Sequence, residues 1–433
     1  MFKAVAGYYK DNERLRLLVK IIAVWLISRA VMLLMVPVMN LIADEPHQWL
    51  YYMNPWDAEW YKGIVENGYQ PPKSSGMASW AFFPLYPLVC MAVRLVTMGS
   101  IDTYAVGMTV SNICIIIAVY YAVKYADIGL DMKKYNKKTV EDIIIFLMLA
   151  GPFAVYYGAM YTEALFILCV ILCFYNSARH NYMAAGIAAA MASATRIVGC
   201  MLVFVLITYM FMEVCAECRA KHNSKVKDNK EAGIIDEYML TDEAGIMLAG
   251  NISLASVIKT FIKNVIKEPK KLVAIMISPL GIFIYMNYLR YLCGDSWAFY
   301  HVQRAWRTQK MFPVIGVLFK SCTGQLTAAS GVKTLNGIIL GWLCVITLML
   351  YAAMIRKKHY ALGIFGIIVL LIPLTSSVMS TLRFIMGSFV IYIGVAEIIA
   401  GCNRYVRYGI IALLSIVEVV VISAWYFWDG LLM

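Results

Sequence analysis

Apolar runs long enough to cross a lipid bilayer recur along the whole chain, and this feature limits the possible folds more than any other. A spanning helix needs about 20 apolar residues, and some runs reach that length while others fall short. The runs lie at residues 18–40, 81–98, 103–125, 141–157, 162–177, 181–195, 197–212, 271–292, 335–355, 361–374, 384–400 and 408–428. The sequence therefore predicts an all-α polytopic membrane protein with about 11–12 transmembrane helices, some of them broken or half-length.

Composition and charge agree with this fold class. Hydrophobic residues make up 62% of the 433 residues and charged residues 15%, whereas soluble domains are about a quarter charged. The formal net charge of +12 invites a nucleic-acid interpretation. We expect no nucleic acid, because the Lys and Arg residues stand in short flanks of apolar segments, where they orient helices in the membrane. The first run, residues 17–43, is too long for a signal-peptide core and is expected to be retained.

Basic clusters predict the orientation, because Lys and Arg concentrate in cytosolic loops. Placing these clusters inside leaves residues 41–80, 293–334 and 375–383 outside the cytosol. One conflict remains. If 81–98 and 103–125 both crossed the membrane fully, the basic cluster at 133–138 would lie outside the cytosol. Either 81–98 is re-entrant, or 181–212 is one long span and the cluster is external, and we prefer the first. The clusters that set this orientation lie at residues 3–16, 133–138, 356–358 and 404–407.

The same pattern divides the chain into three parts. Residues 1–212 form an N-terminal transmembrane module whose first external loop is 41–80, and residues 271–433 form a C-terminal module with an external loop at 293–334. Residues 213–270 are expected to be a cytosolic loop that ends in an amphipathic helix suited to the inner leaflet. Its apolar arc and its basic arc are Val257, Ile258, Phe261, Ile262, Val265 and Ile266 against Lys259, Lys263 and Lys267.

Residues 54–70, NPWDAEWYKGIVENGYQ, form an acidic and Trp-rich island between two apolar runs. Carboxylates beside lipid cost free energy, so an anchoring segment alone does not require Asp57 and Glu59. A chemical role for Asp57 is one interpretation. The other is an interfacial anchor, with Trp56 and Trp60 at headgroup level and Asp57 capping a short helix.

A second island, residues 294–308, belongs to an external loop with five basic residues and a single acid, Asp295. Such a loop runs against the usual charge bias, and an anionic ligand held on that side would explain it. Alternatively, basic residues far from a span end hardly affect orientation. Charged residues also lie at depth in the membrane, where they usually line a cavity or pair with one another; these are Arg29, Glu163, Arg196 and Arg383.

These parts allow one reaction in particular. Nucleotide sugars are confined to the cytosol, so an outward-facing enzyme needs a lipid-linked sugar phosphate as donor. The phosphate leaves as a stable anion that Arg and Lys can hold. The acceptor hydroxyl needs a base, and one carboxylate on the opposite face of the sugar is sufficient, unlike the pair that glycosidases use. Asp57 fits this role.

Metal chemistry has weaker signals. Cys215 and Cys218 form a C-x-x-C followed by His222, but no second pair stands at zinc-ribbon spacing. Asp57 and Glu59 have the D-x-E spacing of acidic metal-binding motifs, yet two carboxylates alone make a weak site. We therefore assign no metal ligand and no cofactor, and leave a divalent cation as an open alternative.

Five motifs, in order along most of the chain, resemble the PIG-V-like mannosyltransferases of the GT-C class of membrane glycosyltransferases. WDAEWYKGIVENGY followed by AFFPLYPLV is the most specific, and the weaker later blocks resemble the bacterial branch of that family. Eukaryotic members carry His and Phe where this chain has Trp60 and Tyr61, and ARSNG in place of its ATRIVG. The later blocks are YTEALF, SATRIVG, GDSWAFYHVQRAW and STLRFIMGSF.

The resemblance implies a GT-C-like helical bundle with its active site in external loops, and a polyprenyl-phosphate-linked sugar as donor. It carries the catalytic acid onto Asp57. Arg196, Arg383, Arg304 and Arg307 are expected to converge on the donor phosphate, with Gln303 and Trp306 orienting the sugar. The full set expected to bind substrate is Trp56, Glu59, Tyr61, Glu163, Arg196, Asp295, Gln303, Trp306 and Arg383.

The sequence thus favours an integral-membrane glycosyltransferase that moves mannose or another hexose, with inversion, to a hydroxyl on the non-cytosolic face of the cell membrane. The acceptor stays open among a lipid, a polysaccharide and a protein. The competing interpretation is a polytopic transporter or a lipid flippase, because intramembrane charges and broken helices also occur there. A third is a non-catalytic membrane scaffold.

Overall fold

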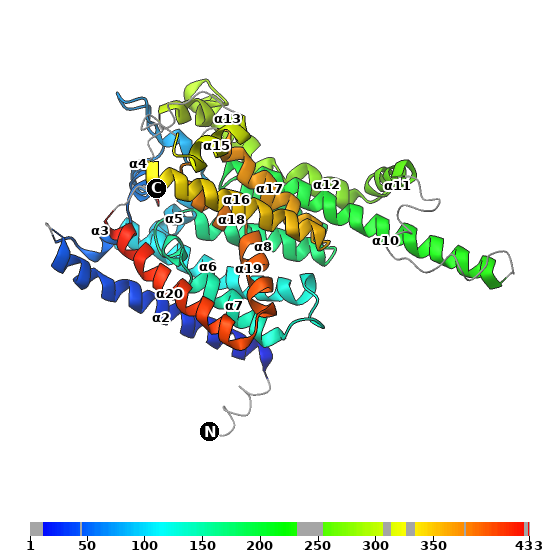
Figure 1. Cartoon of the computed structure of the whole chain (residues 1–433). Helices are drawn as coiled ribbons and strands as arrows, with labels where there is room; N and C mark the ends of the chain where they lie inside the picture. Colours follow the sequence, from blue (N-terminus) through cyan, green and yellow to red (C-terminus); the bar gives the residue numbers. More distant parts are fainter. Residues whose placement is uncertain are drawn as a thin grey trace, which may run out of the picture.

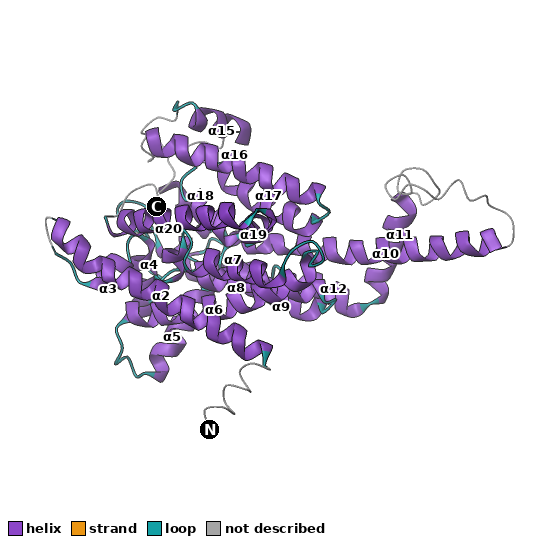
Figure 2. Ribbon diagram, turned by 60° about the horizontal axis from the view of Figure 1, so that its bottom comes forward, coloured by secondary structure: helices purple, strands orange, loops and turns teal. Residues whose placement is uncertain are grey.

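The computed structural model describes residues 12–43, 46–231, 254–305, 313–325, 334–375, 378–427 and 432. Figures 1 and 2 show helices joined by loops, and no strand occurs in these ranges. Side chains are described in the same ranges except at 221–231 and 254.

Five helices are long and apolar enough to cross a membrane, and two bent pairs raise the number to seven if each pair is one span. The remaining five predicted segments hold shorter helices of 12 to 16 residues. The prediction of an all-α polytopic membrane protein with some half-length helices is therefore confirmed. The long helices are α2 (Glu13–Ile42), α6 (Thr103–Gly129), the stretch Ile197–Ala220 of η3 (Ile197–Met201) and α10 (Leu202–Glu231), α16 (Thr334–Arg356) and α20 (Arg404–Tyr426). The shorter ones are α5 (Leu85–Val96), α7 (Lys137–Leu149), α8 (Glu163–Ala178), α9 (Tyr182–Ser193) and α17 (Tyr360–Leu374).

Each bent pair has a local cause. The helices α12 (Pro269–Ile277) and α13 (Leu280–Cys293) meet at 42°, where Pro279 has no backbone N–H to continue the helix. The helices α18 (Thr381–Gly387) and α19 (Val390–Gly401) meet at 71° across Phe389, whose φ of 63° lies outside the helical region. The second bend leaves α18 as a short separate helix packed against α8.

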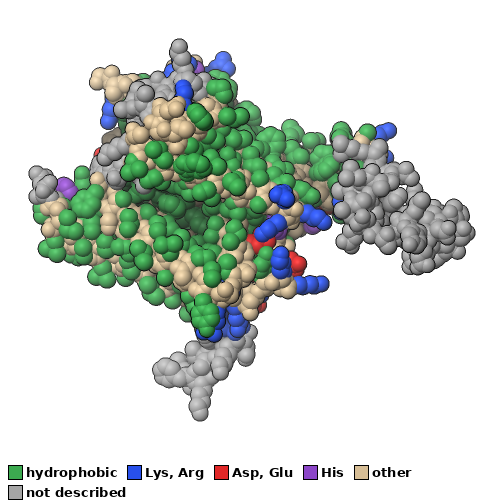
Figure 3. Space-filling model, viewed as in Figure 1, with side chains coloured by type: hydrophobic (Ala, Val, Ile, Leu, Met, Phe, Trp, Pro, Cys, Tyr) green, Lys and Arg blue, Asp and Glu red, His purple; other side chains and the backbone are tan. Residues whose placement is uncertain are grey.

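Hydrophobic side chains cover the face of the bundle shown in Figure 3. Exposed apolar residues on the long helices include Leu34 on α2, Trp342 on α16 and Ile416 on α20. Helices with apolar residues on all sides are expected where lipid is the solvent. The face is hollowed near α18, between α16 and α20.

The polar loops and the basic clusters lie at opposite ends of the bundle. One end holds α4 (Asp57–Asn67) and η1 (Ser79–Ala81), where the Tyr285 hydroxyl donates to the Trp80 carbonyl over 2.8 Å. The other end joins Lys137 to Glu13 at 2.7 Å. The helix α6 connects the two ends and is about 40 Å long at 1.5 Å per residue. The remaining elements of the polar end are α3 (Trp49–Met53), α14 (Ala298–His301), η6 (Val302–Ala305) and α15 (Val314–Cys322).

The helix α5 resolves the conflict in the sequence-based topology. Its 12 residues extend about 18 Å, too short for a hydrocarbon core of about 30 Å. Near its end, Arg94 Nη1 lies 3.9 Å from Glu66 Oε1 of α4. Thr103, the first residue of α6, donates to the same carboxylate over 2.6 Å. The segment 81–98 therefore returns to the end of the bundle where α4 lies, which is the re-entrant alternative.

The predicted amphipathic helix is α11 (Leu254–Lys267). Val257 and Val265 are buried, and the Phe261 ring packs 5.7 Å from that of Phe211 on α10. The rest of its apolar arc is exposed, as are its lysines. Contact of this exposed face with the inner leaflet stays a prediction, as does the division of the chain into three parts.

Candidate active site

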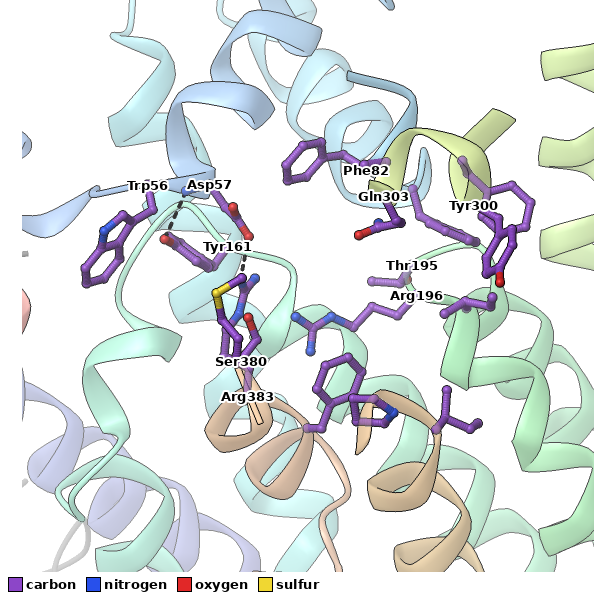
Figure 4. Close-up of a pocket in the computed structure, with 18 of the residues that line it drawn as sticks. Trp56, Asp57, Phe82, Tyr161, Thr195, Arg196, Tyr300, Gln303, Ser380 and Arg383 are labelled. Carbon is purple, nitrogen blue, oxygen red and sulfur yellow. Dashed lines mark hydrogen bonds and ion pairs between the residues drawn. The ribbon is translucent and has the colours of Figure 1, made fainter. Parts of the chain in front are cut away.

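A cavity of about 330 Å³ opens where the polar loops meet the membrane-spanning helices. One wall is polar and holds Asp57, Arg196 and Arg383, which Figure 4 shows pointing toward a common space. Another part of the lining is apolar and is called the apolar wall here. Its residues come from the turn after η1, from η3, α14, α17 and α18, and are Phe82, Phe83, Ile197, Phe299, Ile372, Pro373 and Phe384.

Asp57 is the first residue of α4, and it faces the cavity rather than capping the helix. The N-cap residue is Trp56, which makes no side-chain cap bond and has a φ of 47°. This turn is held by Tyr161, whose hydroxyl accepts from the Asp57 backbone N–H over 3.2 Å and donates to the Pro55 carbonyl over 2.7 Å. The Asp57 carboxylate pairs instead with Arg383. The capping interpretation of Asp57 is therefore wrong.

Four charged side chains form a continuous chain of ion pairs. Arg383 donates from Nη1 to Asp57 Oδ2 and from Nε to Glu163 Oε1. Arg196 donates from Nη2 to the same Glu163 oxygen over 2.7 Å. The order is thus Asp57, Arg383, Glu163, Arg196, with two negative and two positive charges. Buried charges are tolerated when they pair in this way.

One hydrogen-bond donor of Arg196 is buried without a partner among the described residues. This donor is Nη1. The guanidinium carbon lies 5.7 Å from the Phe166 ring centre and 5.6 Å from that of Phe384, so two aromatic faces fix its position. A buried unpaired guanidinium N–H beside a cavity is suited to an anion, since buried donors are nearly always paired.

Other residues expected at the site separate into two groups. Trp56, Tyr61 and Gln303 line the cavity. Glu59 lies outside the lining and accepts a hydrogen bond from the Tyr104 hydroxyl of α6. Glu163 is fully buried behind the two arginines and outside the lining as well.

The second island is only partly at the cavity. Asp295 lies outside the lining and pairs with His301 Nδ1 at 2.7 Å. Hydrogen bonds from His301 and from the Trp297 backbone lower the pKa of Asp295. Arg304 is exposed and is not among the lining residues. The expected contacts of Trp306 and Arg307 lie outside the described residues.

Sequence reasoning missed most of the apolar wall, although FFPLYP contains Phe82 and Phe83. It also expected Arg29 to contribute to a polar cavity. Arg29 instead donates from Nε to Asn112 over 2.7 Å, away from the lining residues. Among the described residues, no group of three or more His, Cys, Asp or Glu side chains is placed to hold a metal ion.

The helical bundle thus brings a carboxylate, two arginines and an apolar wall around one cavity, and the family comparison gives the class of protein. Residues 15–229 match the Mannosyltransferase (PIG-V) family. Over these residues the chain belongs to that family, which confirms the resemblance drawn from the motifs. Asp57, Glu163 and Arg196 lie inside the matched range, whereas Arg383 lies beyond it.

The chain is similar to two solved membrane proteins. ArnT from Cupriavidus metallidurans, bound to undecaprenyl phosphate, is 10% identical with a TM-score of 0.46, over 90% of this chain and 62% of that one. The archaeal oligosaccharyltransferase AglB from Archaeoglobus fulgidus, in complex with an inhibitory peptide and a dolichol-phosphate, is 12% identical with a TM-score of 0.44, over 98% and 56%. The chain thus spans less than two thirds of either structure. No curated protein matches it in sequence.

Proposed function

We propose that this glycosyltransferase moves a hexose, with mannose the first candidate, from a polyprenyl-phosphate-linked donor to an acceptor hydroxyl, with inversion. The observation that carries the proposal is that Asp57 and Arg196 line one cavity, and that Nη1 of Arg196 is buried without a hydrogen-bond partner among the described residues. The first group can accept a proton and the second can hold a phosphate.

The donor fits the two walls of the cavity. Its phosphate needs cations rather than an acid, because it leaves as a stable anion, and Arg196 and Arg383 supply them. Its prenyl chain needs an apolar surface, which Phe83, Ile197 and Pro373 offer. The hollow of the apolar face near α18 in Figure 3 suits entry of such a lipid from the bilayer.

Asp57 acts as general base in this reaction. The acceptor oxygen bonds to the anomeric carbon, the bond from that carbon to the phosphate oxygen breaks, and polyprenyl phosphate leaves with the electron pair. The hydroxyl proton passes to Asp57, and because base and leaving group lie on opposite faces of the sugar, the configuration inverts. Gln303 and Tyr61 line the remaining space and are suited to sugar hydroxyls, with Trp306 a further candidate. Glu59 is bonded by Tyr104 and Asp295 by His301. These two acids would act on the substrate indirectly, by fixing the loops around the cavity.

The proposed orientation places this cavity on the non-cytosolic face. The basic clusters at the opposite end of the bundle support it, because such clusters favour the cytosol. The N-terminus and residues 213–270 are then cytosolic. The acceptor is a lipid, a polysaccharide or a protein that carries a free hydroxyl on the outer side.

The test uses purified protein in detergent with a short-chain polyprenyl-phosphate mannose and a hydroxyl acceptor. Release of polyprenyl phosphate is expected for the native protein. Asp57→Asn, which keeps the shape but not the basicity, should lower the rate about a hundredfold to ten-thousandfold. Near-native release by the Asn variant would remove Asp57 from the mechanism. Movement of the lipid across vesicles without any release would favour the transporter or flippase alternative.

A further inference from the structure

Glu163 differs from the other members of the ion-pair chain because it does not reach the cavity. It is the first residue of α8, its exposed fraction is 0%, and it is absent from the lining. One of its oxygens nevertheless accepts from both arginines that line the cavity. Its position at the start of a helix further stabilises the negative charge. A direct contact with substrate, which the sequence predicted for Glu163, does not fit this placement.

The contacts of Glu163 with Arg196 have a geometric consequence. Because Nη2 of Arg196 donates to Glu163, the planar guanidinium is fixed, and Nη1 is a buried donor that has no partner among the described residues. A planar fork held at one nitrogen presents the others in a defined direction. Glu163 thus determines which N–H of Arg196 remains for an anion.

The contacts of Glu163 with Arg383 have an electrostatic consequence. Arg383 is shared between two carboxylates, the buried Glu163 and the partly exposed Asp57. A carboxylate that pairs with a cation accepts a proton less readily. Since Glu163 neutralises part of the charge of Arg383, Asp57 is held less tightly than it would be by an unshared arginine.

We propose that Glu163 is a positioning residue with two effects: it directs Nη1 of Arg196 toward the donor phosphate, and it weakens the ion pair between Arg383 and the base Asp57. This inference rests on the proposed glycosyl transfer and assigns Glu163 no contact with substrate. It makes a prediction that a purely structural ion pair does not make. Removing the charge of Glu163 leaves surplus positive charge beside the phosphate, while Asp57 becomes a poorer base.

Glu163→Gln is therefore expected to lower kcat without raising the donor KM. Its kcat should fall at least about tenfold, a fraction of the loss expected when a general base is removed. Its donor KM, and its Kd for a short-chain polyprenyl phosphate, should stay within about threefold of native or become lower, because surplus positive charge favours an anion. Glu163→Asp keeps the charge and should recover part of kcat.

The matched control is Glu397→Gln. Glu397 is also buried and paired, with Lys357 at 3.0 Å and with the Tyr135 hydroxyl at 3.0 Å, but it lies at the opposite end of the bundle. This variant should lose stability without changing kcat or KM. Thermal unfolding in detergent is measured for all variants.

Native kinetics in Glu163→Gln, or a parallel rise of KM and loss of kcat that follows the loss of stability as in Glu397→Gln, would overturn the inference. If Glu163→Gln does not fold, Glu163→Asp decides: a lowered kcat at native KM supports the role, and a raised KM at native kcat contradicts it. Failure of the native protein to release polyprenyl phosphate would instead refute the proposed function itself.

Discussion

Replacing Arg196 by Lys tests the proposed donor site directly. The guanidinium donates to Glu163 over 2.7 Å through Nη2 and keeps Nη1 without a partner among the described residues. A Lys ammonium is a point charge on a flexible stem and does not reproduce a planar fork that serves two partners at once. Arg196→Lys is therefore expected to keep the ion pair with Glu163 and to lose the contact with the donor phosphate.

The size of the effect follows from the contact that is lost. A hydrogen bond to a charged group contributes about 1.5–3 kcal/mol, and each 1.4 kcal/mol corresponds to a factor of ten. Catalytic efficiency should therefore fall about 10- to 150-fold in kcat/KM. Most of this should appear as a raised donor KM, because the phosphate is already present in the ground state. The assay is initial-rate kinetics with a water-soluble short-chain polyprenyl-phosphate sugar.

Arg304→Lys provides the comparison, because Arg304 is exposed and lies outside the cavity lining. It should be nearly silent, since exposed single charges contribute little. Native kinetics in Arg196→Lys together with a loss in Arg304→Lys would refute the placement of the phosphate. The phosphate site would then lie in the external loop 293–334, whose basic residues also predicted an anionic ligand.

Three further predictions concern topology, packing and pH. In a background without native cysteines, Ser75→Cys should react with an impermeant reagent in intact cells and Lys270→Cys should not; the reverse labelling would invert the orientation and contradict the outward-facing site. Gly281→Leu should prevent folding or strongly lower the thermal midpoint, because a Cβ there would meet the Ala190 carbonyl oxygen at 2.3 Å and overpacking destabilises cores; an unchanged midpoint would show that α9 and α13 do not pack this closely. The pKa of Asp295 is lowered in the fold by its hydrogen bond from His301, so the ion pair stabilises the fold above the ordinary carboxyl pKa and this stabilisation is lost as pH falls through the lowered value. Since the pair is exposed, Asp295→Asn should change the free energy of unfolding at pH 7 by less than about 1 kcal/mol. A larger change in a thermal melt would show a buried role for Asp295.

Much of the fold was predictable because it depends on local composition. Apolar runs determine where helices form in lipid, and runs shorter than about 20 residues predicted half-length helices such as α5 and α8, which the structure contains. The amphipathic period of 254–267 likewise predicted α11. The path of 81–98 was not decidable from the sequence, because both alternatives are equally apolar. It depends on where α5 ends relative to α4, and that is a tertiary contact.

The sequence by itself determined the fold class and most of the helices, and it singled out Asp57 as the candidate catalytic residue, since each of these depends on contiguous residues. Only the tertiary structure decided which charged groups meet. Asp57 and Arg383, 326 positions apart, form one ion pair, and Glu163 joins Arg383 to Arg196. Glu59, two positions after Asp57, is directed to Tyr104 instead. The physical reason is that the direction of a side chain depends on how its helix is rotated and on what packs against it, and neither is encoded in the spacing of residues along the chain.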